Sequence, residues 1–239
     1  MRIKIFLAGL IFMLAIVGLI RTASKNQHPV DPTTVPPEGK LKWFSKQAKA
    51  KGDEQVVIPA RHVNYGGSAL STTLDEALSY YTVVIAQPIQ EKAYATNPDT
   101  IVTWYKFKVV DTLSQSSAAA CAECTPLDPP QDLLPIQEDE FLLVKNGGIL
   151  MIDGVRVNML DSSFPPFESG KKYLLFISPH PSGVATIGIG PRAIFQTEDG
   201  EMLKSINDLS HPVKDVLRHQ FGNSVGNFKK HLKASTTKS

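Results

Sequence analysis

The sequence has little cysteine and few marks of catalysis. Its 239 residues contain only two cysteines, Cys121 and Cys124. Structural zinc takes about four nitrogen or sulfur ligands, usually as two paired groups, and the six histidines provide no close H-x-x-x-H pair. A P-loop and an H-E-x-x-H motif are also missing. The sequence therefore marks no metal site, no cofactor and no catalytic residue, which favours a function other than catalysis.

The two cysteines form a C-x-x-C pair within SSAAACAECTPLDPP, and several functions can be weighed for it. Thr125 follows the second cysteine, where c-type haem attachment needs histidine. A thioredoxin-like pair lies at the N-terminus of a helix, which lowers the thiol pKa, whereas this pair encloses the acidic Glu123. In an oxidising compartment a short disulfide ring or an exposed pair of thiols remains. We favour a Cys121–Cys124 disulfide that stiffens its loop.

A long apolar run is confined to the N-terminus. The basic start MRIK precedes sixteen apolar residues, 5–20, which end at Arg21. This length lies between that of a signal-peptide core and a minimal membrane-spanning helix, and Arg21-Thr22-Ala23 is a poor cleavage site. The positive-inside rule keeps the short end in the cytoplasm. We expect residues 5–20 to anchor an extracytoplasmic domain in the cell membrane, with a cleaved signal and a secreted or periplasmic domain as the alternative.

Charge is unevenly distributed along the chain. Residues 53–202 contain nine Lys and Arg against nineteen Asp and Glu, whereas the flanks 22–52 and 203–239 are basic. An acidic body argues against nucleic-acid binding, which needs a basic face on the folded domain. The basic flanks fit either anionic lipid or ordinary solvated surface.

The chain divides into four parts by composition. Residues 1–24 form the anchor or signal, and the proline-rich residues 25–40 form a semi-extended linker. Residues 41–206 carry the strand patterns, interrupted by a small, polar, proline-rich insertion at 114–139. Residues 207–239 have the pattern of basic amphipathic helices.

The central part predicts a mainly β fold. In IVTWYKFKVV, 101–110, alternate residues are apolar, and the set starting at Ile101 should face the core. Pairs such as Asp153-Gly154 predict tight hairpin turns. We expect a small antiparallel barrel or sandwich, OB-like, with a short N-terminal helix stopped by Gly52, C-terminal helices and one transmembrane or signal helix.

Several stretches together carry a resemblance to a known kind of domain. They are VVIAQPI, TWYKFKVVDTL, NGG, DGVRV, FPPFESGKKYLLFIS, GPRAIF and EDGE, which span residues 78–204. The chain resembles exported bacterial small β-barrel (OB-like) domains of unknown function, tethered behind an N-terminal signal or anchor. The resemblance implies a fold and no activity, because these stretches are turns and core strands.

One outward-facing set is a candidate for contact with a partner. Trp104, Lys106 and Lys108 share the second face of 101–110, where an exposed tryptophan between lysines could contact an envelope protein or a glycan. The alternative is that a neighbouring element covers Trp104. We expect an uncharacterised binding or scaffolding module of the cell envelope. The alternative is an exported enzyme, a hydrolase or thiol oxidoreductase, whose site the sequence does not mark.

Overall fold

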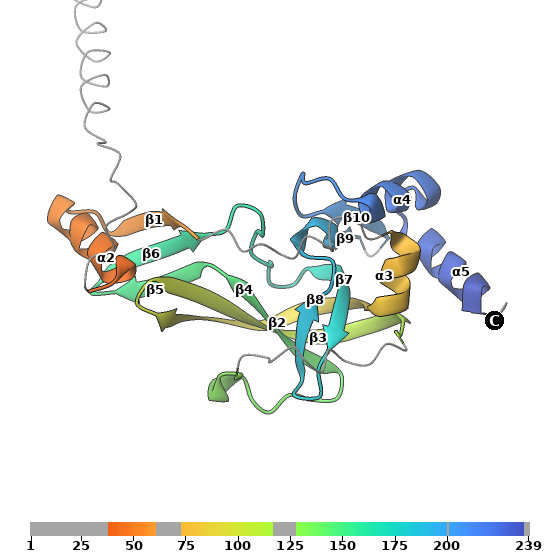
Figure 1. The fold of residues 1–239 in the computed structure, drawn as a ribbon, viewed down its shortest axis with the longest axis horizontal. Helices are drawn as coiled ribbons and strands as arrows, with labels where there is room; N and C mark the ends of the chain where they lie inside the picture. Colours follow the sequence, from red (N-terminus) through yellow and green to blue (C-terminus); the bar gives the residue numbers. More distant parts are fainter. Residues whose placement is uncertain (1–37, 61–72, 117–127, 200, 237–239) are drawn as a thin grey trace, which may run out of the picture. The chain divides into compact units, whose positions relative to one another are not determined.

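The computed structural model describes residues 38–60, 73–116, 128–199 and 201–236 (Figure 1). These residues belong to one compact unit, Glu38–Ser239. The expected anchor at 5–20 and the pair Cys121 and Cys124 lie outside the described residues. Within the described ranges, no helix is both long and apolar enough to cross a membrane.

Five strands of the larger sheet pair in a ring. The strands are β2 (Thr82–Asn97), β3 (Thr100–Ser114), β4 (Glu140–Asn146), β7 (Lys172–Pro179) and β8 (Val184–Ile187). Neighbours follow the order β7-β2-β3-β4-β8, and β8 pairs again with β7, which closes the ring. The mainly β prediction is therefore confirmed. The β4–β8 pair is parallel, which a simple series of hairpins does not produce.

The inside of the ring is filled by aromatic side chains. Phe167 lies edge-on to four other rings, at 5.1 Å from Tyr105, 4.9 Å from Phe107, 5.5 Å from Phe164 and 4.9 Å from Tyr173 between ring centroids. Such edge-to-face pairs add to the stabilisation from burial. The set predicted to face the core does so, with Ile101, Thr103, Tyr105 and Phe107 buried and Val109 half-buried. Val102 and Trp104 of the second set are also buried, so burial alternates only in the later part of the stretch. The inside of the ring is therefore a packed core.

A second, three-stranded sheet carries the N-terminal helix. Its strands are β1 (Gln55–Pro59), β5 (Gly148–Ile152) and β6 (Val155–Leu160), in the order β1-β6-β5 with β1 parallel to β6. Helix α2 (Lys40–Lys51) packs on one face of this sheet, where Leu41 is buried with Ile58 and Val157 (Figure 1). Gly52 ends the helix in the left-handed conformation, as the sequence predicts.

Three further helices cover the outer surface of the ring. They are α3 (Leu74–Tyr80), α4 (Pro212–Phe221) and α5 (Val225–Thr236), near the short strands β9 (Phe195–Glu198) and β10 (Met202–Ser205). Thr73 and Glu76 form a capping box at the start of α3. Val213, Leu217 and Phe221 are buried in one cluster with Val83 of β2 and Phe176 of β7. The apolar stripe of α4 thus packs on the sheet.

Candidate functional site

The three residues proposed for partner contact differ in how far they are exposed. Trp104 is only 3% exposed and packs with Leu133 of the 3₁₀ helix η2 (Gln131–Leu133) and with Leu142. Of the two alternatives for Trp104, the covered one is therefore found. Lys106 lies 3.0 Å from Glu140 in a largely buried ion pair, whereas the side chain of Lys108 is exposed. Partner contact through Lys106 and Lys108 stays a prediction.

The covering segment is the second half of the expected insertion, and it is fixed to the strands. Asp132 accepts hydrogen bonds from Lys92 and Tyr94 of β2. The ammonium of Lys106 donates to the backbone carbonyl of Pro135 over 2.7 Å. Residues 128–139 are therefore a docked part of the domain rather than a loose loop, while 117–127 lie outside the described residues.

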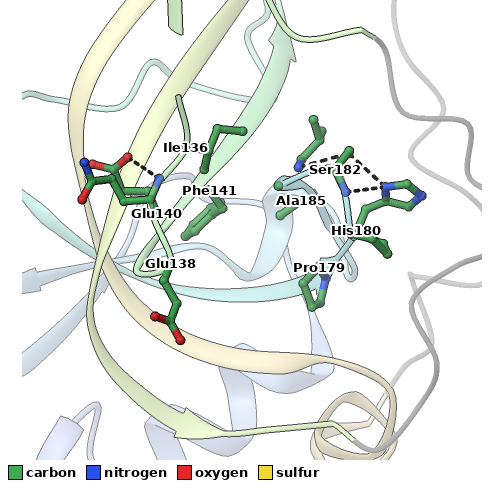
Figure 2. A pocket seen from close by; sticks show the side chains of 12 residues that line it. Ile136, Glu138, Glu140, Phe141, Pro179, His180, Ser182 and Ala185 are labelled. Carbon is green, nitrogen blue, oxygen red and sulfur yellow. Dashed lines mark hydrogen bonds between the residues drawn. The ribbon is translucent and has the colours of Figure 1, made fainter. Parts of the chain in front are cut away.

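This segment also forms one wall of a surface pocket of about 360 Å³ (Figure 2). The opposite wall is the β7–β8 hairpin, whose turn contains His180 and Ser182. In Figure 2 Phe141 and Ala185 lie between the two walls, while Glu138 and His180 stand on different sides. The pocket thus has an apolar floor and a polar rim, the usual make-up of a site for a small ligand or a single side chain.

Hydrogen bonds hold both walls in place. The amide of Leu142 donates to the carbonyl of Gly183 over 2.9 Å, which ties the hairpin to β4. The carboxylate of Glu140 accepts from the amide of Gln137 over 3.0 Å. This backbone bond, followed by the Lys106 ammonium, holds the pKa of the Glu140 carboxyl below its usual range. Both walls of the pocket are therefore held by hydrogen bonds within the chain.

A serine and a histidine are in contact at the rim. The Ser182 hydroxyl lies 2.9 Å from Nδ1 of His180, and the Ser182 amide donates to the same nitrogen over 3.2 Å. The second contact shows that Nδ1 is an acceptor, as it would be in a base that takes a serine proton. The same two contacts also stabilise the turn between β7 and β8. Whether it is a base with its serine or a turn contact, the pair lies at the rim of the pocket.

The chain also contains one G-x-S-x-G stretch, residues 222–226, although no such motif was expected. In α/β-hydrolases the serine of this motif occupies a sharp turn between a strand and a helix. Here Gly222 ends α4, and Ser224 accepts a hydrogen bond from the amide of Asn227 in the first turn of α5, over 3.3 Å. The stretch is a junction between two helices and not a nucleophile turn.

An exposed apolar face lies on the three-stranded sheet. Val57, Ile149, Met151 and Leu160 are exposed, and the register places Val57 and Ile149 on either side of Asn158. The face opposite carries the contacts with α2. Sequence reasoning missed this surface, although consecutive apolar residues in GILMI and QVVIP mark strands that are apolar on both faces.

One lysine is buried away from the pocket. Lys145 lies over the ring of Phe164, and burial lowers its pKa, although the charge of Asp161 acts in the opposite direction.

Among the residues that the structure describes, no group of three or more His, Cys, Asp or Glu could hold a metal ion. A comparison with known protein families and with curated proteins finds no match to this chain.

Proposed function

We propose that the chain is a membrane-anchored, extracytoplasmic module of the cell envelope that binds or scaffolds a partner. Its barrel is OB-like in this proposal. Within the ring, three consecutive strands, β2, β3 and β4, lie side by side, and the later β7 returns beside β2. This 4-1-2-3 arrangement is a Greek key, the topology on which OB barrels are built.

The pocket at the end of the ring is the observation that carries the binding role. Its walls are held by hydrogen bonds, it lies at the end of a filled barrel, and it joins an apolar floor at Phe141 to polar groups at Glu138 and His180. A rigid site of this kind binds with little cost of ordering. The partner is an envelope protein or glycan. It presents a small apolar group to the floor at Phe141, and next to it a hydrogen-bonding or cationic group to the rim at Glu138 and His180.

The location is supported by the sequence. The apolar run 5–20 is flanked by charges in the pattern that exports the following chain, and the proline-rich 25–40 gives the domain reach from the membrane. The exposed apolar face of the three-stranded sheet adds a second surface suited to a protein partner.

A photo-crosslinking amino acid tests the binding role in cells. Introduced at Glu138, on the pocket rim, it should give a discrete adduct; introduced at Lys171, which is exposed and outside the pocket, it should not. Equal labelling at both positions, or none at Glu138, would contradict the proposal.

A maleimide that cannot cross the cytoplasmic membrane tests the location. It reaches Cys121 and Cys124 after reduction only if the domain is exported.

The exported hydrolase remains a second candidate because of the 2.9 Å contact between Ser182 and His180. A fluorophosphonate probe reacts with serines that a neighbouring base activates. Labelling that disappears in Ser182→Ala would support the enzyme, and an unlabelled protein that still gives the Glu138 adduct would support the module.

A further inference from the structure

Helix α2 presents a row of lysines at its exposed surface, next to the face that packs on the sheet. The helix contains five lysines and no acidic residue. Lys42, Lys46 and Lys49 are exposed and follow one another at spacings of four and three residues, which places them along one side of the helix. The helix therefore has an apolar inner face and a cationic outer one.

The orientation of this helix is fixed by its inner face. Leu41, Ser45 and Ala48 are buried, and the Ser45 hydroxyl donates to the carbonyl of Ile152 over 2.7 Å. Rotation of the helix about its axis would break this bond and expose Leu41. The lysine row consequently stays at the exposed surface beside the buried face.

The contacts that these lysines already make are weak enough to leave their ammonium groups available to bind negatively charged groups. Lys46 pairs with Glu38, and Lys49 donates to the carbonyl of Asp153 over 3.4 Å, both at the exposed surface. Exposed pairs are weak and easily exchanged. A dense layer of negative charge can therefore take over both ammonium groups.

A tryptophan stands beside the lysines. Trp43 is half-buried and lies edge-on to Phe44, with 4.7 Å between ring centroids. Tryptophan is enriched where a bilayer meets water, because its ring is apolar and its N–H can remain hydrated. Lysines flanking such a ring are typical of surfaces that lie on lipid.

We propose that the outer face of α2, formed by Lys42, Trp43, Lys46 and Lys49, binds anionic phospholipid headgroups. This inference rests on the anchored location in the proposed function. The apolar run ends at residue 20 and α2 begins at Lys40, so a short proline-rich stretch leads from the expected span to the lysine row. Docking at the surface would hold the barrel and its pocket in one orientation to the bilayer.

Tryptophan fluorescence of the full chain in vesicles tests this docking. Brominated lipids quench only a tryptophan at the membrane, and Trp104, being 3% exposed, gives a constant background that Trp43→Phe isolates. Quenching of Trp43 should be strong in vesicles that contain phosphatidylglycerol and weak in phosphatidylcholine alone. It should fall in 0.5 M salt, because screening weakens surface charge interactions.

Replacement of the lysines gives the matched comparison. Lys42→Gln, Lys46→Gln and Lys49→Gln together should lower the ratio of docked to undocked domain by about 100-fold, since each lysine near an anionic surface contributes about fivefold. The control replaces Lys171, Lys204 and Lys230, which are exposed elsewhere on the domain, and should leave the quenching unchanged. Circular dichroism checks that both variants fold.

The results of these experiments distinguish a failure of lipid docking from a failure of the proposed membrane anchor. A chain that floats with the vesicles but shows equal Trp43 quenching in both lipids overturns the docking alone. Equal losses in the two triple variants also overturn it. A chain that does not float with either vesicle overturns the anchor, and with it the proposed location.

Discussion

The backbone amide of Lys40 donates to the carboxylate of Asp99 over 2.6 Å, across 59 residues of sequence. Helix α2 begins after Gly39, which has no side chain to cap it, and its first turn contains no acidic residue. Asp99, in the turn between β2 and β3, supplies both the missing acceptor and a negative charge at the positive end of the helix. The tip of the long hairpin thus fixes the start of α2.

Asp99→Ala should lower the free energy of unfolding by about 1 kcal/mol, the usual cost of losing an N-terminal cap. Asp99→Asn should cost less, because it keeps the acceptor and loses only the charge. Urea unfolding of the full chain in detergent measures both. Asp75→Ala, at an exposed position of α3 that is not its cap, is the control. Equal effects for the two alanine variants would contradict a specific role for Asp99.

Local structure was predictable because its signals lie within a few residues. Gly52 stops α2, Thr73 and Glu76 cap α3, and Asp153 and Gly154 adopt the positive φ of a tight hairpin turn. Each of these effects depends on backbone conformation and on neighbours close in sequence. The inward set of β3 was predictable for the same reason, since side chains alternate along any strand.

Pairings between distant strands were not predictable in this way. The parallel pairs β1–β6 and β4–β8 join strands from far apart in the chain, and only packing in three dimensions selects their register. The pocket depends on the second of these pairs. Trp104 was ambiguous because Leu133, which covers it, lies in a polar, proline-rich stretch with no periodic pattern.

The wall of the pocket should be sensitive to acid. The folded-state pKa of Glu140 lies below its unfolded value of 4.5, so its contribution to stability is present above pH 4.5 and is lost as the pH falls through the folded pKa. Glu140→Gln should therefore remove part of the acid dependence of unfolding. Hydrogen exchange of residues 135–140 should also become faster, because the bond to the Gln137 amide weakens.

Glu198→Gln is the matched control for this change. Glu198 pairs with Lys204 at 3.2 Å, but both side chains are half or more exposed, whereas those of Lys106 and Glu140 are only 12% and 11% exposed. Exposed pairs contribute about 0.2–1 kcal/mol or less. A double-mutant cycle on Lys106 and Glu140 should give a larger coupling energy than one on Lys204 and Glu198. Equal couplings would contradict the role given to this pair.

Tyrosines inside the ring should make the protein sensitive to alkali. Burial, assisted by the charge of Glu91, raises the pKa of Tyr105 above its usual 10.0, and burial also raises that of Tyr173. Below pH 10 both states keep these protons, so stability is unaffected. Above pH 10 only the unfolded chain releases them, and stability falls by about 1.4 kcal/mol per pH unit for each group until its folded pKa is reached.

Tyr105→Phe should remove one of these contributions and reduce the slope of stability between pH 10 and 11. Its cost at neutral pH should be about 1 kcal/mol, that of the buried hydrogen bond between its hydroxyl and the backbone of Phe167. Urea unfolding at pH 9, 10 and 11 measures both effects. Tyr80→Phe, at a site that is 62% exposed, should keep the full slope. An unchanged slope in Tyr105→Phe would mean that the ring opens before the tyrosine ionises.

The start of α4 depends on a buried histidine used as a cap. His211 is 1% exposed, and its Nδ1 accepts the amide of Val213 over 3.2 Å, at the position where serine, threonine, aspartate or asparagine is usual. Oδ1 of asparagine can occupy the place of Nδ1, so His211→Asn should retain the cap, whereas His211→Ala loses it. Because Val213 and Leu217 pack on the sheet, losing the cap should also weaken the packing of α4 on the ring.

We expect the alanine variant to be destabilised by about 1–2 kcal/mol and the asparagine variant by less. Hydrogen exchange in α4 should become faster in the alanine variant alone. Equal destabilisation without faster exchange would show that His211 contributes packing rather than a cap.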